Sequence, residues 1–318
     1  MKRLSVAVGL AVLLSGCAGQ SGARTDVAAG PTQSPSAAPS SASPSPSPTS
    51  ASPTAPPAPV VPAGVTAGIV VFDRQTGQFV YNVNPAHRFR SASLVKLLIV
   101  LDLLWGKNAV PAADRAQLDI MLRSSDDSAA TRFWKRGGQR AIVSRMVGRL
   151  GLADSAPPPA DKPGFWGYTA LSAGDMVRVY RYLLDSAPGA VRDYVLGNLH
   201  QSTKCGTDRY DQSFGIPSAF AKPWAAKQGW SGFGDNPATP CTVTAALPLA
   251  AQAPAAAAPN PVDMSGEVLH TTGTVGAGDR VIIAVLSVHP DGTAYAKATK
   301  NLTALVRSLA IPGATPLT

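Results

Sequence analysis

Hydrophobic and polar positions divide the chain into an unpatterned N-terminal part and a patterned remainder. Residues 18–62 consist mainly of Ser, Pro, Ala and Thr and contain almost no large apolar side chains. Such a segment buries too little surface to offset the entropy lost on folding, so the composition predicts a disordered, locally stiff linker. From residue 63 onward, apolar positions recur with strand and helix periods, which predicts one folded domain over residues 63–318.

Strands are expected at both ends of this folded part. Residues 66–73 and 78–82 predict two strands joined by a turn, and residues 267–274 and 280–288 predict two more. Residues 227–230 form a shorter strand-like segment between them. Strands separated by a long helical region predict an α+β fold, in which a sheet of distant segments lies beside a helical lobe.

The region between the strands has a helical period. Residues 94–105 are hydrophobic nearly all round, which predicts a buried central helix. Further helices are expected over residues 111–122, 129–135, 139–150, 172–184, 189–201 and 293–310. Ser172 followed by Asp175 is typical of a helix N-terminus. Residues 156–167 and 236–260 are rich in Pro with Gly or Ala, and we expect them to be loops.

Composition narrows the classes of partner. The 318-residue chain has a net charge of +9, but its Lys and Arg residues are spread thinly and form no nucleic-acid motif. We therefore expect no nucleic-acid partner, since a protein that faces anionic polymers or lipid head groups explains the charge better. The four His residues show no metal-ligand spacing, so we expect neither a metal nor another cofactor.

Residues 1–17 have the pattern of a secretory signal. Lys2 and Arg3 precede an apolar run to Leu14 that is too short to span a membrane. Residues 14–17 resemble the lipobox of bacterial lipoproteins, in which cleavage leaves Cys17 as the lipid-bearing N-terminus; a plain cleaved signal is the alternative. Acyl chains such as palmitate on Cys17 would anchor the protein in the cell membrane on its extracytoplasmic face.

Two further cysteines, Cys205 and Cys241, lie in the folded part. An oxidising extracytoplasmic compartment favours a disulfide between them, which would stabilise the fold by roughly 3 to 4 kcal/mol. Two free thiols are the alternative, because a sequence does not contain the distance between the sulfur atoms.

Chemistry is first indicated by Ser93 and Lys96, which lie three residues apart at the start of the apolar segment. On a helix this spacing puts both side chains on one face, within reach of each other. A serine hydroxyl becomes a nucleophile when a neighbouring group takes its proton, and a desolvated lysine can do so. The alternative is a buried helix that merely contains one Ser and one Lys.

Two later motifs argue against coincidence: S-D-D at residues 125–127 and K-Q-G at residues 227–229. Together with S-L-V-K at residues 93–96, they resemble the S-x-x-K, S-D-N and K-T-G motifs of class A β-lactamases and penicillin-binding proteins. The resemblance covers roughly residues 65–310 and looks most like the alanine-rich actinobacterial lipoproteins of this superfamily. It implies the β-lactamase/transpeptidase-like fold, an antiparallel sheet packed with helices.

The resemblance also implies a role for each matching residue. Ser93 would attack an amide carbonyl and form an acyl-enzyme, with Lys96 as its base or proton relay. Ser125 would pass a proton to the departing nitrogen, and Lys227 would place positive charge beside Ser125 and the substrate carboxylate. The backbone N–H groups of Ser93 and Trp230 would form the oxyanion hole. The implied partners are peptidoglycan stem peptides or β-lactams.

Three substitutions depart from the family's pattern within the expected substrate-binding residues. Asp127 stands where the family has Asn and can pair with Lys96, which would make Lys96 a poorer base. Gln228, next to the retained Gly229, replaces a hydroxyl residue that commonly binds the substrate carboxylate. Trp230 is bulky where the family usually has a small residue, so we expect it to narrow the cleft or stack on a ligand.

The fourth departure is the lack of a glutamate between the second and third motifs. The chain's single glutamate, Glu267, follows the K-Q-G motif. Class A enzymes hydrolyse the acyl-enzyme with a glutamate in that intermediate loop, where this chain has only Asp154 and Asp161, in no matching motif. Efficient β-lactamase turnover by the usual route is therefore not expected.

Two functional hypotheses remain open. The first is a serine enzyme with slow acyl transfer, either D,D-peptidase-like or weakly β-lactamase-like. The second is a binding or scaffold lipoprotein of the cell envelope that has kept the fold and lost the chemistry. The retained motif residues favour the first hypothesis, and the four departures favour the second. A purely structural tether would leave the three motifs unexplained.

Overall fold

The computed structural model describes residues 56–242, 262 and 266–317. The expected signal sequence with Cys17, the linker up to residue 55 and most of the loop expected at 236–260 lie outside the described residues. Within the described part of the chain, no helix is both long enough and apolar enough to cross a membrane.

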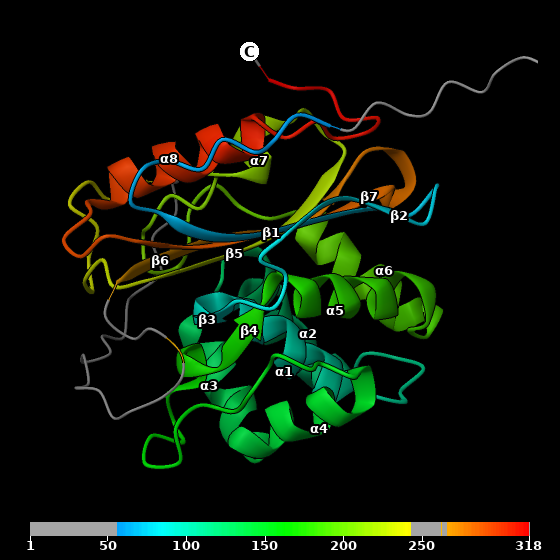
Figure 1. Cartoon of the computed structure of the whole chain (residues 1–318). Coiled ribbons are helices and arrows are strands. Elements are labelled where there is room, and N and C mark those ends of the chain that lie inside the picture. The colour runs from blue at the N-terminus through cyan, green and yellow to red at the C-terminus, as the bar shows by residue number, and fades with distance from the viewer. Residues whose placement is uncertain (1–55, 243–261, 263–265, 318) are drawn as a thin grey trace, which may run out of the picture. The chain divides into compact units, whose positions relative to one another are not determined.

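A five-stranded antiparallel sheet lies at the centre of the folded part (Figure 1). Its strands are β1 (Thr66–Asp73), β2 (Gln78–Val83), β5 (Trp224–Ser231), β6 (Glu267–Val275) and β7 (Val281–His289). Their order is β2-β1-β7-β6-β5, so strands from the two ends of the sequence are neighbours, with Ile69 of β1 opposite Val285 of β7. The predicted α+β sheet of distant segments is confirmed.

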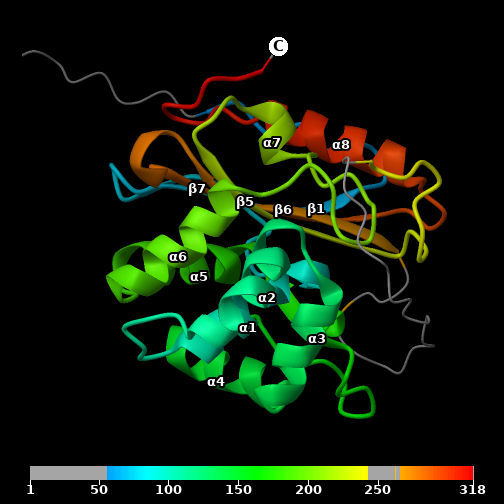
Figure 2. The ribbon, with the colours of Figure 1, turned by 180° about the vertical axis from the view of Figure 1, so that it is seen from behind.

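Helices cover both faces of this sheet (Figures 1 and 2). On one face lie α8 (Tyr295–Arg307) and the short α7 (Ile216–Ala219). The helical lobe on the other face contains α1 (Val95–Leu104), α2 (Ala112–Arg123), α3 (Asp127–Arg136), α4 (Arg140–Leu150), α5 (Ala173–Asp185) and α6 (Gly189–His200). Each face buries its own apolar core, one centred on α1 and α5 and the other beneath α8.

Several short elements were not predicted. The strands β3 (Arg88–Arg90) and β4 (Ala170–Ser172) pair antiparallel, and α7 has only four residues. The loop expected at 156–167 contains the start of a 3₁₀ turn, η2 (Trp166–Tyr168). Segments of three or four residues carry too little periodicity to be recognised in a sequence. The predicted cap of α5 is present, because the Ser172 hydroxyl accepts a hydrogen bond from the Asp175 N–H at 3.1 Å.

The predicted buried central helix is α1, and it positions the candidate nucleophile. Leu97, Leu98 and Ile99 are buried in the lobe core. A single 3₁₀ turn, η1 (Ala92–Leu94), precedes α1, and this turn contacts the edge strand β5. The first turn of the central helix therefore faces the edge of the sheet, and the site lies between them.

Candidate active site

Four side chains from the three motifs meet between η1, the turn before α3 and β5. Lys96 Nζ lies 2.7 Å from Ser93 Oγ and 3.1 Å from Ser125 Oγ. Lys227 Nζ donates to the same Ser125 hydroxyl oxygen at 2.9 Å. All four residues are nearly inaccessible, and Ser93 is the most exposed of them at 6 %. A continuous series of hydrogen bonds therefore connects Ser93, through Lys96 and Ser125, to Lys227.

The backbone is strained beside both serines. Ala92, directly before Ser93, has a φ of +44°, and Ser125 itself has a φ of +58°. Residues with a Cβ enter this left-handed region at a cost of roughly 1–3 kcal/mol each, and such residues cluster at functional sites. Lys96 Nζ also donates to the backbone oxygen of Ser125 at 2.6 Å, which holds the strained turn against α1.

Asp127 changes the surroundings of Lys96. Its Oδ1 lies 2.6 Å from Lys96 Nζ, so the ion pair expected from the sequence is present. The lysine side chain is fully buried, whereas the Asp127 side chain is 46 % exposed. Four acceptors, namely the Ser93 and Ser125 hydroxyls, the Ser125 carbonyl and the Asp127 carboxylate, surround the three N–H groups of a charged Lys96, which has no lone pair for the Ser93 proton. In this charged form Lys96 cannot accept the proton of Ser93.

Lys227 differs from Lys96 in its electrostatic surroundings. Complete burial lowers the pKa of Lys227 well below its usual value, and the charge of Lys96 lowers it further. The charges of Asp127 and Asp208 act in the opposite direction. A lysine that loses its proton more readily than usual, hydrogen-bonded to Ser125, can exchange a proton with that hydroxyl.

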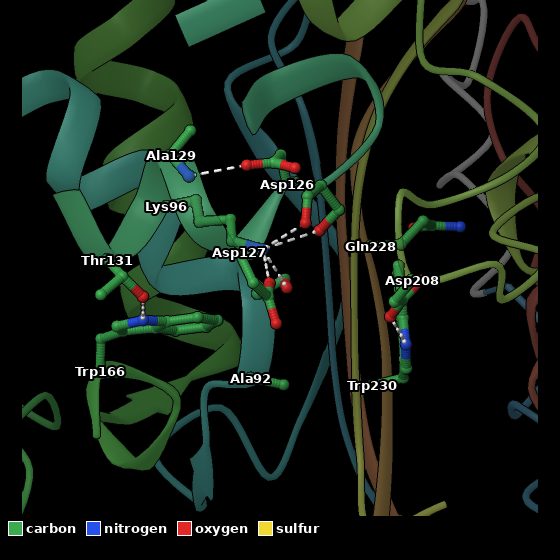
Figure 3. A network of polar contacts seen from close by, with 12 residues as sticks. Ala92, Lys96, Asp126, Asp127, Ala129, Thr131, Trp166, Asp208, Gln228 and Trp230 are labelled. Carbon is green, nitrogen blue, oxygen red and sulfur yellow. Dashed lines mark hydrogen bonds and ion pairs between the residues drawn. The ribbon is translucent and has the colours of Figure 1, made fainter. Parts of the chain in front are cut away.

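The Gln228 side chain points away from Lys96 (Figure 3). Side chains alternate along a strand, so Gln228 and its neighbour Lys227 project from opposite faces of β5. Its side-chain amide donates to the backbone oxygens of Gln212 and Phe214. The Gln228 side chain thus supports the chain segment after α6 and lies outside the hydrogen-bonded series around Ser93. Gly229 returns to the nucleophile's side, where a Cβ would lie 3.1 Å from the Ser91 oxygen.

The Trp230 indole also lies on the side of β5 away from Lys96 (Figure 3). Its N–H donates to Asp208 Oδ2 at 2.9 Å, and its ring packs near Tyr210 and Phe214, with ring centroids 6.2 and 6.3 Å away. The indole, which we expected to narrow the cleft or stack on a ligand, thus belongs to an aromatic cluster on that side of the strand. The backbone of Trp230 remains in the edge strand beside η1.

Two residues near Lys96 were not apparent from the motifs, and the first is Trp166. Lys96 Nζ lies 4.8 Å from the centroid of the Trp166 ring, and the indole N–H donates to Thr131 Oγ1 at 3.1 Å (Figure 3). Trp166 belongs to the Pro- and Gly-rich loop in which we sought a carboxylate. An aromatic face offers a cation–π contact to an ammonium but no base for a water molecule.

Asp208 is the second residue that the motifs did not indicate. Burial raises the pKa of its carboxyl group, and the charge of Asp127 adds to this effect, whereas Lys96 lowers it. The segment that carries Asp208 is held by the Cys205–Cys241 disulfide, which the structure contains, and by a hydrogen bond from the Thr207 N–H to the Ser124 oxygen at 2.9 Å. The sequence places Asp208 close to a cysteine but does not indicate its proximity to Lys96.

The other acidic residues weighed in the sequence bind elsewhere. Asp154 is tied to the start of α5, because its N–H donates to Asp175 and its carboxylate accepts from Ser172. Glu267 Oε1 accepts from the Gly292 N–H at 2.9 Å. Asp161 is exposed. Among the residues that the structure describes, no group of three or more His, Cys, Asp or Glu side chains is placed to hold a metal ion.

Comparison with known sequences finds partial relatives. No protein-family model matches the chain. The chain is 43 % identical over 175 residues to the proteins named "Putative lipoprotein LppW" of Mycobacterium bovis and Mycobacterium tuberculosis. The matched region is 52 % of this chain and 54 % of those proteins, so the chain spans about half the length of the curated relatives it matches.

Comparison with solved structures identifies the fold. The chain is similar to PBP-A with a TM-score of 0.54 and 14 % identity, covering 78 % of this chain and 89 % of that one. It is similar to the β-lactamase of Streptomyces albus G with a TM-score of 0.53 and 14 % identity, covering 78 % and 95 %. A class A β-lactamase of Mycobacterium abscessus gives a TM-score of 0.52, 16 % identity and coverage of 77 % and 92 %. The chain has the β-lactamase/transpeptidase-like fold that the three motifs predict.

Proposed function

We propose that this protein is a lipoprotein of the cell envelope whose folded domain forms a slowly hydrolysed acyl-enzyme on Ser93. The observation that carries the proposal is the hydrogen-bonded series from Ser93 through Lys96 and Ser125 to Lys227. The fold shared with PBP-A and class A β-lactamases supports it, as does the relative named a lipoprotein. A lipid on Cys17 would anchor the domain on the extracytoplasmic face of the membrane, close to peptidoglycan.

The proposed reaction begins with the Ser93 hydroxyl. Its oxygen attacks the carbonyl carbon of an amide or lactam while its proton moves to Lys96 in the neutral form, whose Nζ lies 2.7 Å away. The backbone N–H groups of Ser93 and Trp230 would donate to the oxyanion of the tetrahedral intermediate. When the C–N bond breaks, Ser125 passes a proton to the departing nitrogen and recovers one from Lys96, 3.1 Å from its oxygen.

Slow release of the acyl group follows from the surroundings of Lys96. Hydrolysis of an ester needs a base beside a water molecule, and the loop between the second and third motifs contains no glutamate. The Trp166 ring lies against Lys96 on the side of this loop. Peptidoglycan stem peptides are the acyl donors that fit an envelope location, and β-lactams would act as their mimics.

The test is intact-mass spectrometry of the chain from residue 18 onward after incubation with benzylpenicillin. We expect a stoichiometric adduct that persists for many minutes after the free drug is removed. The Ser93→Ala variant is the control and should show no adduct, provided that circular dichroism confirms its fold. An adduct that decays within seconds would contradict slow hydrolysis, and a folded protein that never acquires one would contradict acyl transfer.

Ligand binding without catalysis is a second candidate, favoured by the ion pair between Lys96 and Asp127 at 2.6 Å. While this pair persists, Lys96 cannot accept the proton of Ser93. The Asp127→Asn variant separates the two candidates. Acylation that appears only in the variant would assign the natural chain to the binding class, whereas acylation of both proteins would assign it to the enzymes.

A further inference from the structure

The side-chain donors of β5 that could hold a ligand carboxylate are already used within the protein, and two of them, Gln228 and Trp230, lie on the face away from Ser93. Lys227 Nζ donates to Ser125 Oγ and to the backbone oxygen of Gln228, each at 2.9 Å. The Gln228 amide donates to two backbone oxygens of the segment after α6, and the Trp230 indole donates to Asp208. A carboxylate that entered the site would have to break one of these bonds, which costs free energy.

A carboxylate acceptor, in contrast, is available in the site. Asp127 Oδ1 binds Lys96, but no described residue hydrogen-bonds its second oxygen, Oδ2, and the side chain is 46 % exposed. Asp127 is the first residue of α3, and its side chain lies beside Lys96, as Figure 3 shows. An ionised carboxylate only accepts hydrogen bonds, so it repels the oxygen of a carbonyl or carboxylate and pairs with an N–H donor.

Asp208, which accepts a hydrogen bond from the Trp230 indole, also interacts electrostatically with Lys96 and Lys227, although burial raises the pKa of its carboxyl group. Asp127, Asp208 and Lys96 all act electrostatically on Lys227, and burial lowers the pKa of Lys227. The half-exposed Asp127 and the largely buried Asp208 thus both act on Lys227 through their charge. The guanidinium of Arg90 is directed to the backbone oxygens of Ser231 and Gly266. With these cations bound inside the protein, the half-exposed Asp127 carboxylate is the group left to attract a ligand, and it favours a cationic one.

We propose that the site selects acyl donors that carry a primary ammonium group, bound at Asp127 Oδ2, over otherwise identical donors without one, and disfavours a free carboxylate on the donor. This inference rests on the proposed function and names its substrate class: amides or esters of amino acids and peptides with a free amine near the scissile bond. Asp127 is the specificity-determining residue, and Asp208 strengthens the preference through its charge.

The test compares four probes with one reactive core: benzylpenicillin, its α-amino derivative, and the methyl ester of each. The second-order rate constant for acylation of Ser93 is measured by intact-mass spectrometry on the chain from residue 18 onward. We expect the α-amino probe to react three- to tenfold faster than benzylpenicillin, the size of one partly exposed ion pair. The methyl esters should react faster than the free acids.

Two variants test which residue causes the preference for the α-amino probe. Asp127→Asn should reduce the ratio of the α-amino to the plain probe to about one, whatever happens to the absolute rates, and Asp208→Asn should reduce it partially. Equal rates for all four probes in the natural chain, or a ratio unchanged in Asp127→Asn, would overturn the inference and leave acyl transfer standing.

A failure of acyl transfer is distinguishable from a failure of the charge preference. If no probe acylates the natural chain, the proposed function fails, and the preference is then tested by calorimetric binding of the same probes to Ser93→Ala. Tighter binding of the α-amino probe, lost in the Ser93→Ala/Asp127→Asn double variant, supports the inference. Equal binding of all probes, or none, overturns it.

Discussion

The two faces of strand β5 carry different parts of one motif. Lys227 and Gly229 face the helical lobe, where Lys227 joins Ser125 and Gly229 lies against the turn that carries Ser93. Gln228 and Trp230 face the other way and bind the segment after α6. The first face carries the residues that match the K-T-G pattern, and the second carries the two that depart from it.

This difference shows why the chain tolerates such departures. Side chains alternate along a strand, so a change at position 228 or 230 alters a face that does not contact Ser93. Asp127 is the exception among the departures, because it lies at the start of α3 and contacts Lys96 directly. The changes in β5 therefore affect how the strand packs against the segment after α6, whereas Asp127 alters the surroundings of Lys96.

The largest expected effect concerns the nucleophile's face. Lys96→Met removes the group that takes the Ser93 proton in the proposed reaction, so the acylation rate with benzylpenicillin should fall on the order of 10²- to 10⁴-fold. Lys300→Met is the matched control, because Lys300 is exposed on α8, and its rate should not change. Intact-mass kinetics measure both. Full activity of Lys96→Met would mean that another group takes the proton.

Gly273→Ala should displace strand β5 and so disturb the packing on both of its faces. A Cβ at Gly273 of β6 would lie 1.9 Å from the Ala225 backbone oxygen, so β5 would have to move away from β6. We expect the free energy of unfolding in urea to fall by about 3 kcal/mol or more. Gly148→Ala, in α4 with nothing within 4 Å of the new Cβ, should instead keep or slightly raise stability. If the two variants had equal free energies of unfolding, the close approach of Gly273 to the Ala225 oxygen would be refuted.

His270, buried in β6 beside β5, should make the free energy of unfolding depend on pH. Burial lowers the pKa of His270 from 6.5 to about 4 in the folded protein. As the pH falls, His270 therefore takes up a proton in the unfolded state before it does so in the folded state. This should lower the free energy of unfolding by up to about 3 kcal/mol between pH 6.5 and pH 4.

Urea unfolding of the His270→Gln variant at pH 7, 5.5 and 4.5 tests this sign. The variant should be less stable at neutral pH and should lose less stability on acidification. His87→Gln, at an exposed position, is the control and should keep the slope of the natural chain. The buried His289, whose pKa is also lowered to about 4, should leave a residual slope in both variants. An unchanged slope in His270→Gln would contradict the assignment.

The smallest effect is expected on the opposite face of β5. Gln228→Thr leaves the backbone oxygens of Gln212 and Phe214 without their donor, which should lower the free energy of unfolding by about 1–2 kcal/mol. The acylation rate should stay within about threefold, because the side chain lies away from Ser93. A tenfold increase in rate would show that this position contacts the substrate after all, and the contrast between the two faces would no longer hold.

Much of the fold could be predicted because it depends on local pattern. Strand alternation and helical period placed β1, β7 and the buried α1 within one or two residues of their bounds. The three-residue strands β3 and β4 escaped prediction, since their pairing depends on segments far apart in the chain. Lys96 near Ser93 followed from helical spacing, whereas Lys227 required a resemblance, because it approaches Ser125 across 102 residues of sequence.

By itself, the sequence determined which residue types are present: the two serines, the two lysines, the aspartate at position 127 and the lack of a glutamate between the motifs. Only the tertiary structure decided their relations. It paired Asp127 with Lys96, turned Gln228 and Trp230 away from the nucleophile, and brought Trp166 and Asp208 close to the site. The reason is physical: spacing along a chain specifies contacts within one helix or strand, but packing between elements determines which charges share a buried volume.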